Sequence, residues 1–579
     1  MEMAATAPDS PLERAAARAS NHRVTDLRAR GEPFTWLLGG CLSLGVVMII
    51  GFLLLVLWNG FLTFVPQKIA VVTSKDGKVI AGEAFRAERF RPAPDVLAAL
   101  TPDERSAVAK GDGMIGRTLY RVANFDLYGE DFKWVIDPDV KSVEYPADMV
   151  IVERLEWGPF IGRVEAITLD GKAVEGNDLK APAVVKAHEE ARERWARMRE
   201  IERDEIGALN HDLEVARLDV RRAELKYGAD SPQQRAALTE LDRVTKDMQS
   251  QFARLTAEVQ ALRSTSDKYS VTFADIGDRE KVVPLANIVR AYRPNALTFG
   301  EQVGVYFSRW GEFLTAEPRE ANTEGGVMPA IFGTLAMTLL MVIVVAPFGV
   351  ITALYLREYA KQGRLVSFVR ISVNNLAGVP SIVYGVFGLG FFAYVVGGTI
   401  DSLFFPERLP NPTFGTGGLM WAAFTLALLT VPVVIVATEE ALAAVPRSMR
   451  EGSLACGASK WQTIRNIVLP RAMPGVMTGI ILAMARGAGE VAPLMLVGVV
   501  KLAPGLPIDG IFPYVHLERS FMHLGFHIFD VGFQSRNSEA GKPMVFVTTV
   551  LLITLVAVMN AAAIVIRSRL KRRFAGSQF

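Results

Sequence analysis

Two ionisable residues, Arg486 and Glu490, lie four positions apart in an otherwise apolar segment that reads Arg-Gly-Ala-Gly-Glu-Val-Ala-Pro from 486 to 493. A helix places residues with this spacing on one face, and at bilayer depth each charge is costly unless it is paired or faces a polar pathway. Arginine supplies a fixed cation whose planar fork suits an oxyanion such as phosphate, and Glu490 could hold it or modulate its field. We therefore predict that this segment borders an anion pathway. The alternative is an ion pair that only ties helices together.

A second candidate segment, residues 374–385, reads Asn-Asn-Leu-Ala-Gly-Val-Pro-Ser-Ile-Val-Tyr-Gly and falls inside a predicted membrane span. Proline and glycine are expected to break the helix there, which exposes backbone groups that can line a path. The predicted pathway residues are Arg486, Glu490, Asn374, Asn375, Pro380 and Ser381.

A third segment, residues 439–470, is polar and basic and separates two apolar runs. Gly457 predicts a turn after a short helix, a second helix is expected from about Trp461, and Pro470 marks the point where the chain enters the membrane. Two short helices joined by a glycine turn form a rigid knob, which transmits force better than a flexible loop. The alternative is an amphipathic helix that lies on the membrane without a partner.

Several other patterns are rejected as sites. Residues 452–457 have phosphate-loop glycine spacing, but Ala458 stands where the lysine must be and no strand precedes it, so we expect this chain not to bind ATP itself. His188 lacks a second histidine at Arg192, which excludes the zincin motif. With two cysteines the chain has no disulfide framework. We also predict no metal site at the remaining clustered histidines, His516, His523 and His527.

The spacing in the basic segment resembles the coupling-loop signature of bacterial ABC importer permeases: Glu-Ala-Ala, three residues, Gly, nine residues, Ile-x-Leu-Pro. Gly452 and Ser453 replace the two alanines, and small residues are thereby retained. The resemblance implies that the knob sits in a groove of an ATPase, so that closure of two ATPase subunits on ATP rotates the attached spans. It assigns this coupling role to Glu451, Gly457, Ile467, Leu469 and Pro470.

Segments 374–385 and 486–493 resemble the corresponding parts of phosphate-importer permeases of the Pst type, and the chain resembles the PstA-type long form with an extra N-terminal periplasmic domain. This implies a non-enzymatic permease subunit for inorganic phosphate, without a cofactor of its own, since ATP and Mg would be bound by the partner ATPase. The implied partners are a homologous second permease, two ATPase subunits, a periplasmic phosphate-binding protein and membrane lipid. Alternatives are a permease for molybdate, sulfate or an organic solute, and a membrane sensor, which the short cytoplasmic segments disfavour.

The composition fits a membrane protein with one large polar part: 579 residues, 50% hydrophobic and 21% charged. The formal net charge of +2 gives no reason to expect nucleic acid as a partner. Apolar runs long enough to span about 30 Å of hydrocarbon predict six transmembrane helices. These runs are residues 36–65, 328–356, 366–396, 417–437, 473–500 and 543–566.

The basic residues predict the orientation of these spans. Arginines at 14, 18, 23, 28 and 30 precede the first run, which lacks a signal-cleavage pattern and is interpreted as an uncleaved anchor. Alternation then places the loop 439–471 and both termini on the cytoplasmic side and residues 66–327 on the outer side. The resemblance implies that the membrane is a bacterial inner (plasma) membrane and that the outer side is the periplasm. The predicted domains are a tail (1–35), an anchor (36–65), the periplasmic domain (66–327), the permease core (328–566) and a basic tail (567–579).

The polar region 66–327 contains no run of about 20 apolar residues and is therefore predicted to be a soluble insertion. Its first part, 68–171, has the pattern of a small mixed α/β structure. Heptad spacing in 206–227 and 238–262, interrupted by Gly-Ala-Asp-Ser-Pro (228–232), predicts an antiparallel coiled-coil hairpin within 183–266. The hairpin is either a spacer or a docking surface. The predicted class is thus a mainly α membrane protein of the type I ABC importer permease fold, with a periplasmic α/β insertion.

Overall fold

The computed structural model describes residues 33–575 except 103–104, 107, 109–111, 513 and 536–537. It divides into two compact units, residues 1–58 and 59–579. Nearly all of the predicted cytoplasmic tail, with its arginines, lies outside the described residues, as do the last four residues of the basic tail. The first unit contains most of helix α2 (Pro33–Leu62), whose apolar side chains are mostly exposed, as expected of a lipid-facing span.

Six helices in the described part of the chain are long and apolar enough to cross a membrane, which confirms the predicted number. Their bounds are Trp36–Leu62, Met328–Tyr359, Ser381–Phe404, Leu419–Ala443, Lys460–Gly489 and Glu539–Arg572. We refer to them as the first to sixth spans.

Two spans differ from their predicted bounds. In place of one helix over 366–396, the structure has α11 (Arg364–Leu376), a break at 377–380, and a span that begins with α12 (Ser381–Phe387) and ends with α13 (Gly398–Phe404). The break follows from Pro380, which lacks a backbone donor and disfavours helical geometry in the residue before it.

The predicted fifth run, 473–500, is likewise interrupted. Helix α17 (Leu469–Gly489) ends where Glu490 becomes extended, and a separate short helix, α18 (Ala492–Val497), follows. Pro493 occupies the first turn of α18, where its missing N–H costs nothing. The first break confirms the interruption expected from proline and glycine in 374–385, whereas the second break, at Glu490, was not predicted.

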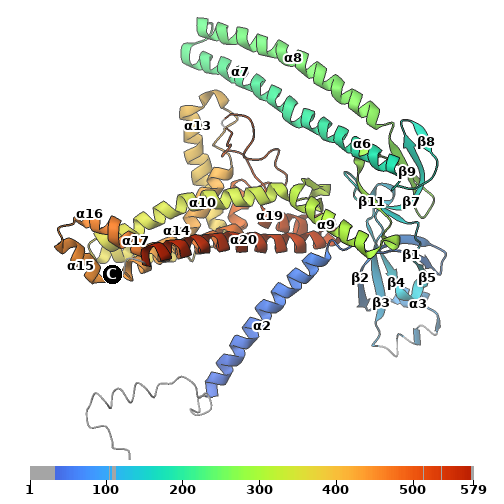
Figure 1. The fold of residues 1–579 in the computed structure, drawn as a ribbon, viewed down its shortest axis with the longest axis horizontal. Coiled ribbons are helices and arrows are strands. Elements are labelled where there is room, and N and C mark those ends of the chain that lie inside the picture. Colours follow the sequence, from blue (N-terminus) through green and yellow to red (C-terminus); the bar gives the residue numbers. More distant parts are fainter. Residues whose placement is uncertain are drawn as a thin grey trace, which may run out of the picture. The chain divides into compact units, whose positions relative to one another are not determined.

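The membrane core is built on α10 (Met328–Leu354), α14 (Leu419–Ala443) and α17, which pack against one another, with α20 (Ser538–Ala575) against α17 (Figure 1). Glycines lie at the helix crossings. A Cβ atom on Gly479 would come within 2.6 Å of the Ala437 Cβ, and one on Gly349 within 2.6 Å of the Val434 side chain. Close backbone approach of this kind stabilises helix packing in lipid, where apolar burial offers no driving force between helices.

The insertion contains two larger sheets in which every pairing is antiparallel. The first has the order β4-β3-β2-β1-β5, and the second the order β10-β9-β7-β6-β11 with β8 paired to β7. The strands are β1 (Ile69–Ser74), β2 (Val79–Phe90), β3 (Ile115–Arg121), β4 (Phe132–Ile136), β5 (Val140–Glu144), β6 (Val150–Arg154), β7 (Phe160–Leu169), β8 (Lys172–Val174), β9 (Ser270–Ala274), β10 (Glu280–Pro284) and β11 (Ile288–Tyr292).

A long helical hairpin is inserted between β8 and β9. It starts with α6 (Pro182–Glu200), continues through a π-helical turn into α7 (Ile206–Tyr227), and returns as α8 (Pro232–Ser266), which lies beside α7 (Figure 1). The reversal uses Gly228 at φ +89° and Ser231, whose side chain caps α8 at the Gln234 N–H. The hairpin is therefore present, while coiled-coil packing of its seam stays a prediction.

Candidate functional site

Arg486 lies in the last turn of α17 and Glu490 immediately follows the helix. The Arg486 Nε and Glu490 Oε1 atoms are 3.6 Å apart, and the two side chains are 36% and 21% exposed. Glu490 is the only acidic residue within ion-pair distance of Arg486 among the described residues. Because a separation of 3.6 Å is too long for a good hydrogen bond, the guanidinium retains donors that can reach an anion.

The two broken spans meet beside this pair. Helix α12 packs against α18, and a Cβ atom on Gly385 would lie 2.7 Å from Pro493 Cα and 3.0 Å from the Pro493 carbonyl oxygen. On the other side, a Cβ atom on Gly487 would lie 2.4 Å from the Met341 sulfur of α10. The Arg486 segment is thus held against the second span, and the segment after Glu490 is held against the third.

Tyr384 is a residue of this site that the sequence interpretation missed. Its side chain is buried, and its hydroxyl donates a hydrogen bond across the break to the carbonyl oxygen of Leu376. That carbonyl belongs to the end of α11, where helical partners are missing. Tyr384 therefore satisfies a backbone group that the break would leave unpaired. It stood in the quoted 374–385 segment, but only the fold indicates its partner.

The remaining predicted pathway residues flank the break, and no hydrogen bond or ion pair joins them to Arg486 within the described part of the chain. Asn374 and Asn375 lie in the last turn of α11 with exposed side chains, which make no hydrogen bond within the described structure. Pro380 is exposed and directly precedes α12, and Ser381 is its half-buried first residue. Their role in a substrate path stays a prediction.

A methyl group at Gly385 is expected to destabilise the protein by about 1–3 kcal/mol, because it overlaps the Pro493 backbone and forces the two broken spans apart. Thermal unfolding of the Gly385→Ala variant in detergent micelles measures this cost. Gly390→Ala in the same span is the matched control, since a Cβ atom there meets nothing within 4 Å. Equal melting temperatures for the two variants would contradict the packing described.

The basic segment folds as two short helices around a glycine turn. Helix α15 (Arg447–Ala455) is followed by the turn at Gly457, which has φ +85° and donates its N–H to the Leu454 carbonyl oxygen. Helix α16 (Lys460–Thr463) begins at a capping box formed by Ser459 and Gln462, and then continues into α17. The left-handed conformation explains the need for glycine at 457.

The exposed face of this segment combines polar and apolar groups. Glu451 and Gly457 are exposed, and so are the large apolar side chains of Leu454 and Trp461, at 49% and 54%. A hollow of about 370 Å³ separates α15 from the start of α17, and its lining includes Gly452, Ser453, Ile467 and Pro470. Leu469 is half-buried next to it. Exposed apolar groups on a rimmed, hollowed surface are typical of a protein contact site.

The same segment is fixed to the rest of the core by polar contacts. Arg450 donates hydrogen bonds to the Val445 and Leu442 carbonyl oxygens at 2.7 Å each, and to Glu358 at the end of the second span at 2.9 Å. Lys460 lies 4.9 Å above the ring of Tyr359. Movement of α15 would therefore be transmitted to the second span through these contacts. It would also be transmitted to the fourth and fifth spans, because the chain connects them to α15 directly.

The histidines in the loop before the sixth span differ in their hydrogen-bond partners. All three are buried, and His516 contacts Asp509 at 2.9 Å and Glu518 at 3.1 Å. No group of three or more His, Cys, Asp or Glu residues in the described part of the chain is arranged to hold a metal ion. His188 contacts only the Ile288 carbonyl oxygen among its described neighbours, at 2.7 Å.

Acid is expected to destabilise the protein through His523 and His527. Burial lowers the pKa of each side chain to about 4; for His527 the nearby Asp530 and Lys501 act in opposite directions. The unfolded chain binds these protons near pH 6.5, whereas the folded chain resists them until about pH 4, so stability falls as pH decreases through this window. Near pH 4, each of the two histidines lowers the free energy of unfolding by roughly 3 kcal/mol.

Thermal unfolding in detergent micelles between about pH 7.5 and pH 4.5 tests this expectation. The double variant His523→Asn/His527→Asn should show a flatter pH dependence than the parent chain. His211→Asn, at a half-buried position on α7, is the matched control and should leave the pH dependence unchanged. Identical profiles for the parent and the double variant would contradict the assignment.

Part of the chain is similar to known membrane transport proteins. Residues 345–572 match the family described as binding-protein-dependent transport system inner membrane component. Similar proteins include a probable ABC transporter permease, YqgH, of Bacillus subtilis (35% identical over 204 residues), and the phosphate transport system permease proteins PstA 1 of Mycobacterium tuberculosis (41% over 175) and PstA of Haemophilus influenzae (31% over 185). The matches cover 34%, 30% and 32% of this chain and span 62%, 51% and 59% of those relatives.

Two solved structures are also similar, although they superpose poorly on the chain as a whole. They are an inward-facing MetNI methionine ABC transporter (TM-score 0.31, 22% identity, covering 42% of this chain and 94% of that one) and a bacterial alginate importer (TM-score 0.33, 14% identity, covering 45% and 83%). The family match, rather than these two likenesses, confirms for residues 345–572 the resemblance inferred from the motifs.

Proposed function

We propose that this chain is the membrane permease subunit of an ATP-driven importer of inorganic phosphate, and that it couples closure of an ATPase to translocation. The observation that carries the proposal is Arg486, a cation within the fifth span at the junction of two broken helices, whose one acidic partner among the described residues lies at 3.6 Å. The names of the PstA relatives support phosphate as the substrate.

The chemistry of the junction favours a tetrahedral oxyanion. Arginine donates a fixed fork of N–H groups, and unwound backbone beside it supplies further polar groups where the spans are interrupted. Glu490 keeps the guanidinium partly neutralised, so that an anion is attracted but can leave again.

The basic segment 439–470 would receive the ATPase. Its two short helices and glycine turn are rigid, its face carries exposed Leu454 and Trp461, and its spacing fits the coupling-loop signature. ATP and Mg would be bound by two ATPase subunits, while a homologous second permease and a periplasmic phosphate-binding protein complete the importer. This arrangement requires residues 439–471 and both termini to face the cytoplasm and the insertion 66–327 to face the periplasm.

Complementation tests the proposed substrate. A bacterial strain without its own high-affinity phosphate importer would express this chain together with its partner subunits, and uptake of radiolabelled phosphate at limiting concentration would be measured. We expect uptake that arsenate competes away and that sulfate and molybdate leave unchanged. Competition by sulfate or molybdate, with weak phosphate uptake, would assign the chain to another oxyanion.

A further inference from the structure

The far part of the hairpin contacts the membrane core of its own chain. Arg222 on α7 donates hydrogen bonds from Nε and Nη2 to Glu407 Oε1, at 3.1 and 2.7 Å. Glu407 follows the third span, and its side chain is only 2% exposed. Asp219, one turn earlier on α7, accepts a hydrogen bond from Arg222 at 2.6 Å and orients the guanidinium. Helix α7 packs against the short turn Pro406–Arg408, which follows α13 at the end of the third span; Figure 1 shows the hairpin extending toward this end of the span.

Glu407 depends on this contact. Burial alone would raise the pKa of its carboxyl, but the hydrogen bonds from Arg222 and from its own backbone outweigh burial and hold that pKa below the usual value. Arg222 is the only ion-pair partner of Glu407 among the described residues. Removing Arg222 would take away the two hydrogen bonds and the paired charge of a buried carboxylate, with Arg408 as the remaining nearby cation, which is a less favourable state.

The loop that carries Glu407 is tied to two spans by hydrogen bonds. Asp401, which is fully buried at the end of the third span, accepts hydrogen bonds from the backbone N–H groups of Phe414 and Gly415. Trp421 in the fourth span donates its indole N–H to the Phe414 carbonyl oxygen at 2.6 Å. A force on Glu407 is therefore passed to both the third and the fourth spans.

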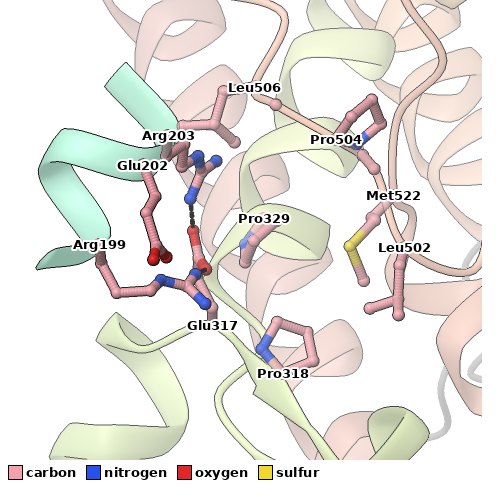
Figure 2. A pocket seen from close by; sticks show the side chains of 12 residues that line it. Arg199, Glu202, Arg203, Glu317, Pro318, Pro329, Leu502, Pro504, Leu506 and Met522 are labelled. Atoms are coloured by element: carbon pink, nitrogen blue, oxygen red, sulfur yellow. Dashed lines mark hydrogen bonds and ion pairs between the residues drawn. The ribbon is translucent and has the colours of Figure 1, made fainter. Parts of the chain in front are cut away.

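The base of the hairpin is fixed at a second point. Arg199 and Arg203 both pair with Glu317, which lies in the segment that leads into the second span; the Arg199 pair measures 2.7 Å. Figure 2 shows this contact at the edge of a pocket of about 340 Å³, with Pro329 of the second span and Leu502 on its other side. The helix between Arg203 and Arg222 covers roughly 28 Å at 1.5 Å per residue.

We propose that the hairpin is an intramolecular strut: held at Glu317 and at Glu407, it fixes the distance between the start of the second span and the end of the third. The third span contains the break at 377–380 and contacts the segment after Glu490, so the strut restrains the region where we place substrate passage. This inference goes beyond the proposed function, and its test does not depend on what the chain transports.

Hydrogen–deuterium exchange of the full chain in lipid nanodiscs tests the strut. Arg222→Glu is expected to accelerate exchange in residues 405–418 about tenfold or more, because the ion pair becomes a repulsion. Arg221→Glu, which makes the same charge change at the adjacent exposed position, should leave that loop unchanged. The reversed pair Arg222→Glu/Glu407→Arg should restore most of the protection.

Glu407→Gln provides a second test that removes the charge but keeps the shape, so it avoids the folding risk of charge reversal. It should raise loop exchange by a smaller factor, of about three- to tenfold. Unchanged exchange in both Arg222→Glu and Glu407→Gln, or equal effects of Arg222→Glu and Arg221→Glu, would overturn the proposal. A loop protected only when an external protein is added would instead identify the hairpin as a docking arm.

Discussion

Phosphate uptake is expected to fall by about 100-fold or more when Arg486 is replaced with alanine, while assembly with the ATPase is unchanged. Each hydrogen bond to a charged group contributes about 1.5–3 kcal/mol, and a bidentate contact to an anion would lose two of them. The position tolerates the change structurally, because Arg486 is 36% exposed and pairs with Glu490 only at 3.6 Å. Initial uptake rates and copurification of the ATPase measure the two expectations.

Arg486→Lys is the matched control for charge without the planar fork. It should retain part of the uptake, on the order of a tenth, with a raised apparent KM for phosphate. Normal uptake by Arg486→Ala would remove this residue from the substrate path. Loss of uptake together with loss of ATPase binding or a much lower melting temperature would instead favour the purely structural ion pair.

The second large effect is expected at the turn of the basic segment. Gly457→Asp should abolish the link between ATP hydrolysis and uptake, because it places a side chain at φ +85° and a new negative charge on the proposed docking face. The backbone strain alone is about 1–2 kcal/mol. ATPase activity and uptake are measured together in reconstituted proteoliposomes, and the expected result is hydrolysis at the basal rate with uptake at least about tenfold lower.

Gly452→Ala is the control for this prediction. Gly452 lies inside α15, and a Cβ atom there meets nothing within 4 Å, so alanine should be tolerated and should favour the helix by up to about 1 kcal/mol. If ATP hydrolysis stays fully coupled to uptake in Gly457→Asp, the turn does not transmit force. A loss of coupling in Gly452→Ala as large as that in Gly457→Asp would show that the segment responds to any change.

The spans and the hairpin could be predicted from the sequence because both depend on local patterns. An apolar run of about 20 residues strongly predicts a membrane-spanning helix. Heptad spacing on both sides of Gly228 and Pro232 predicts two helices that reverse direction between them. The turn at Gly457 was predictable for the same reason, since the glycine and the helix signals around it lie within one short segment.

The contacts that define the candidate site could not be predicted, because they join residues distant in sequence. Gly385 and Pro493 each carry a local signal for a break, yet neither indicates that the two breaks touch. The break in the third run was predictable from Pro380 and the neighbouring glycines, whereas the end of α17 at Glu490 was not predicted. Likewise, Arg222 and Glu407 are ordinary charged residues in the sequence, and only the fold brings them together.

The most direct test of the central claim is ATP-dependent accumulation of radiolabelled phosphate by proteoliposomes that contain this chain, its partner permease, the ATPase and the phosphate-binding protein. We predict accumulation that requires ATP and is lost in Arg486→Ala. Absence of phosphate accumulation by the assembled, ATP-hydrolysing complex, or accumulation that Arg486→Ala leaves intact, would contradict the account.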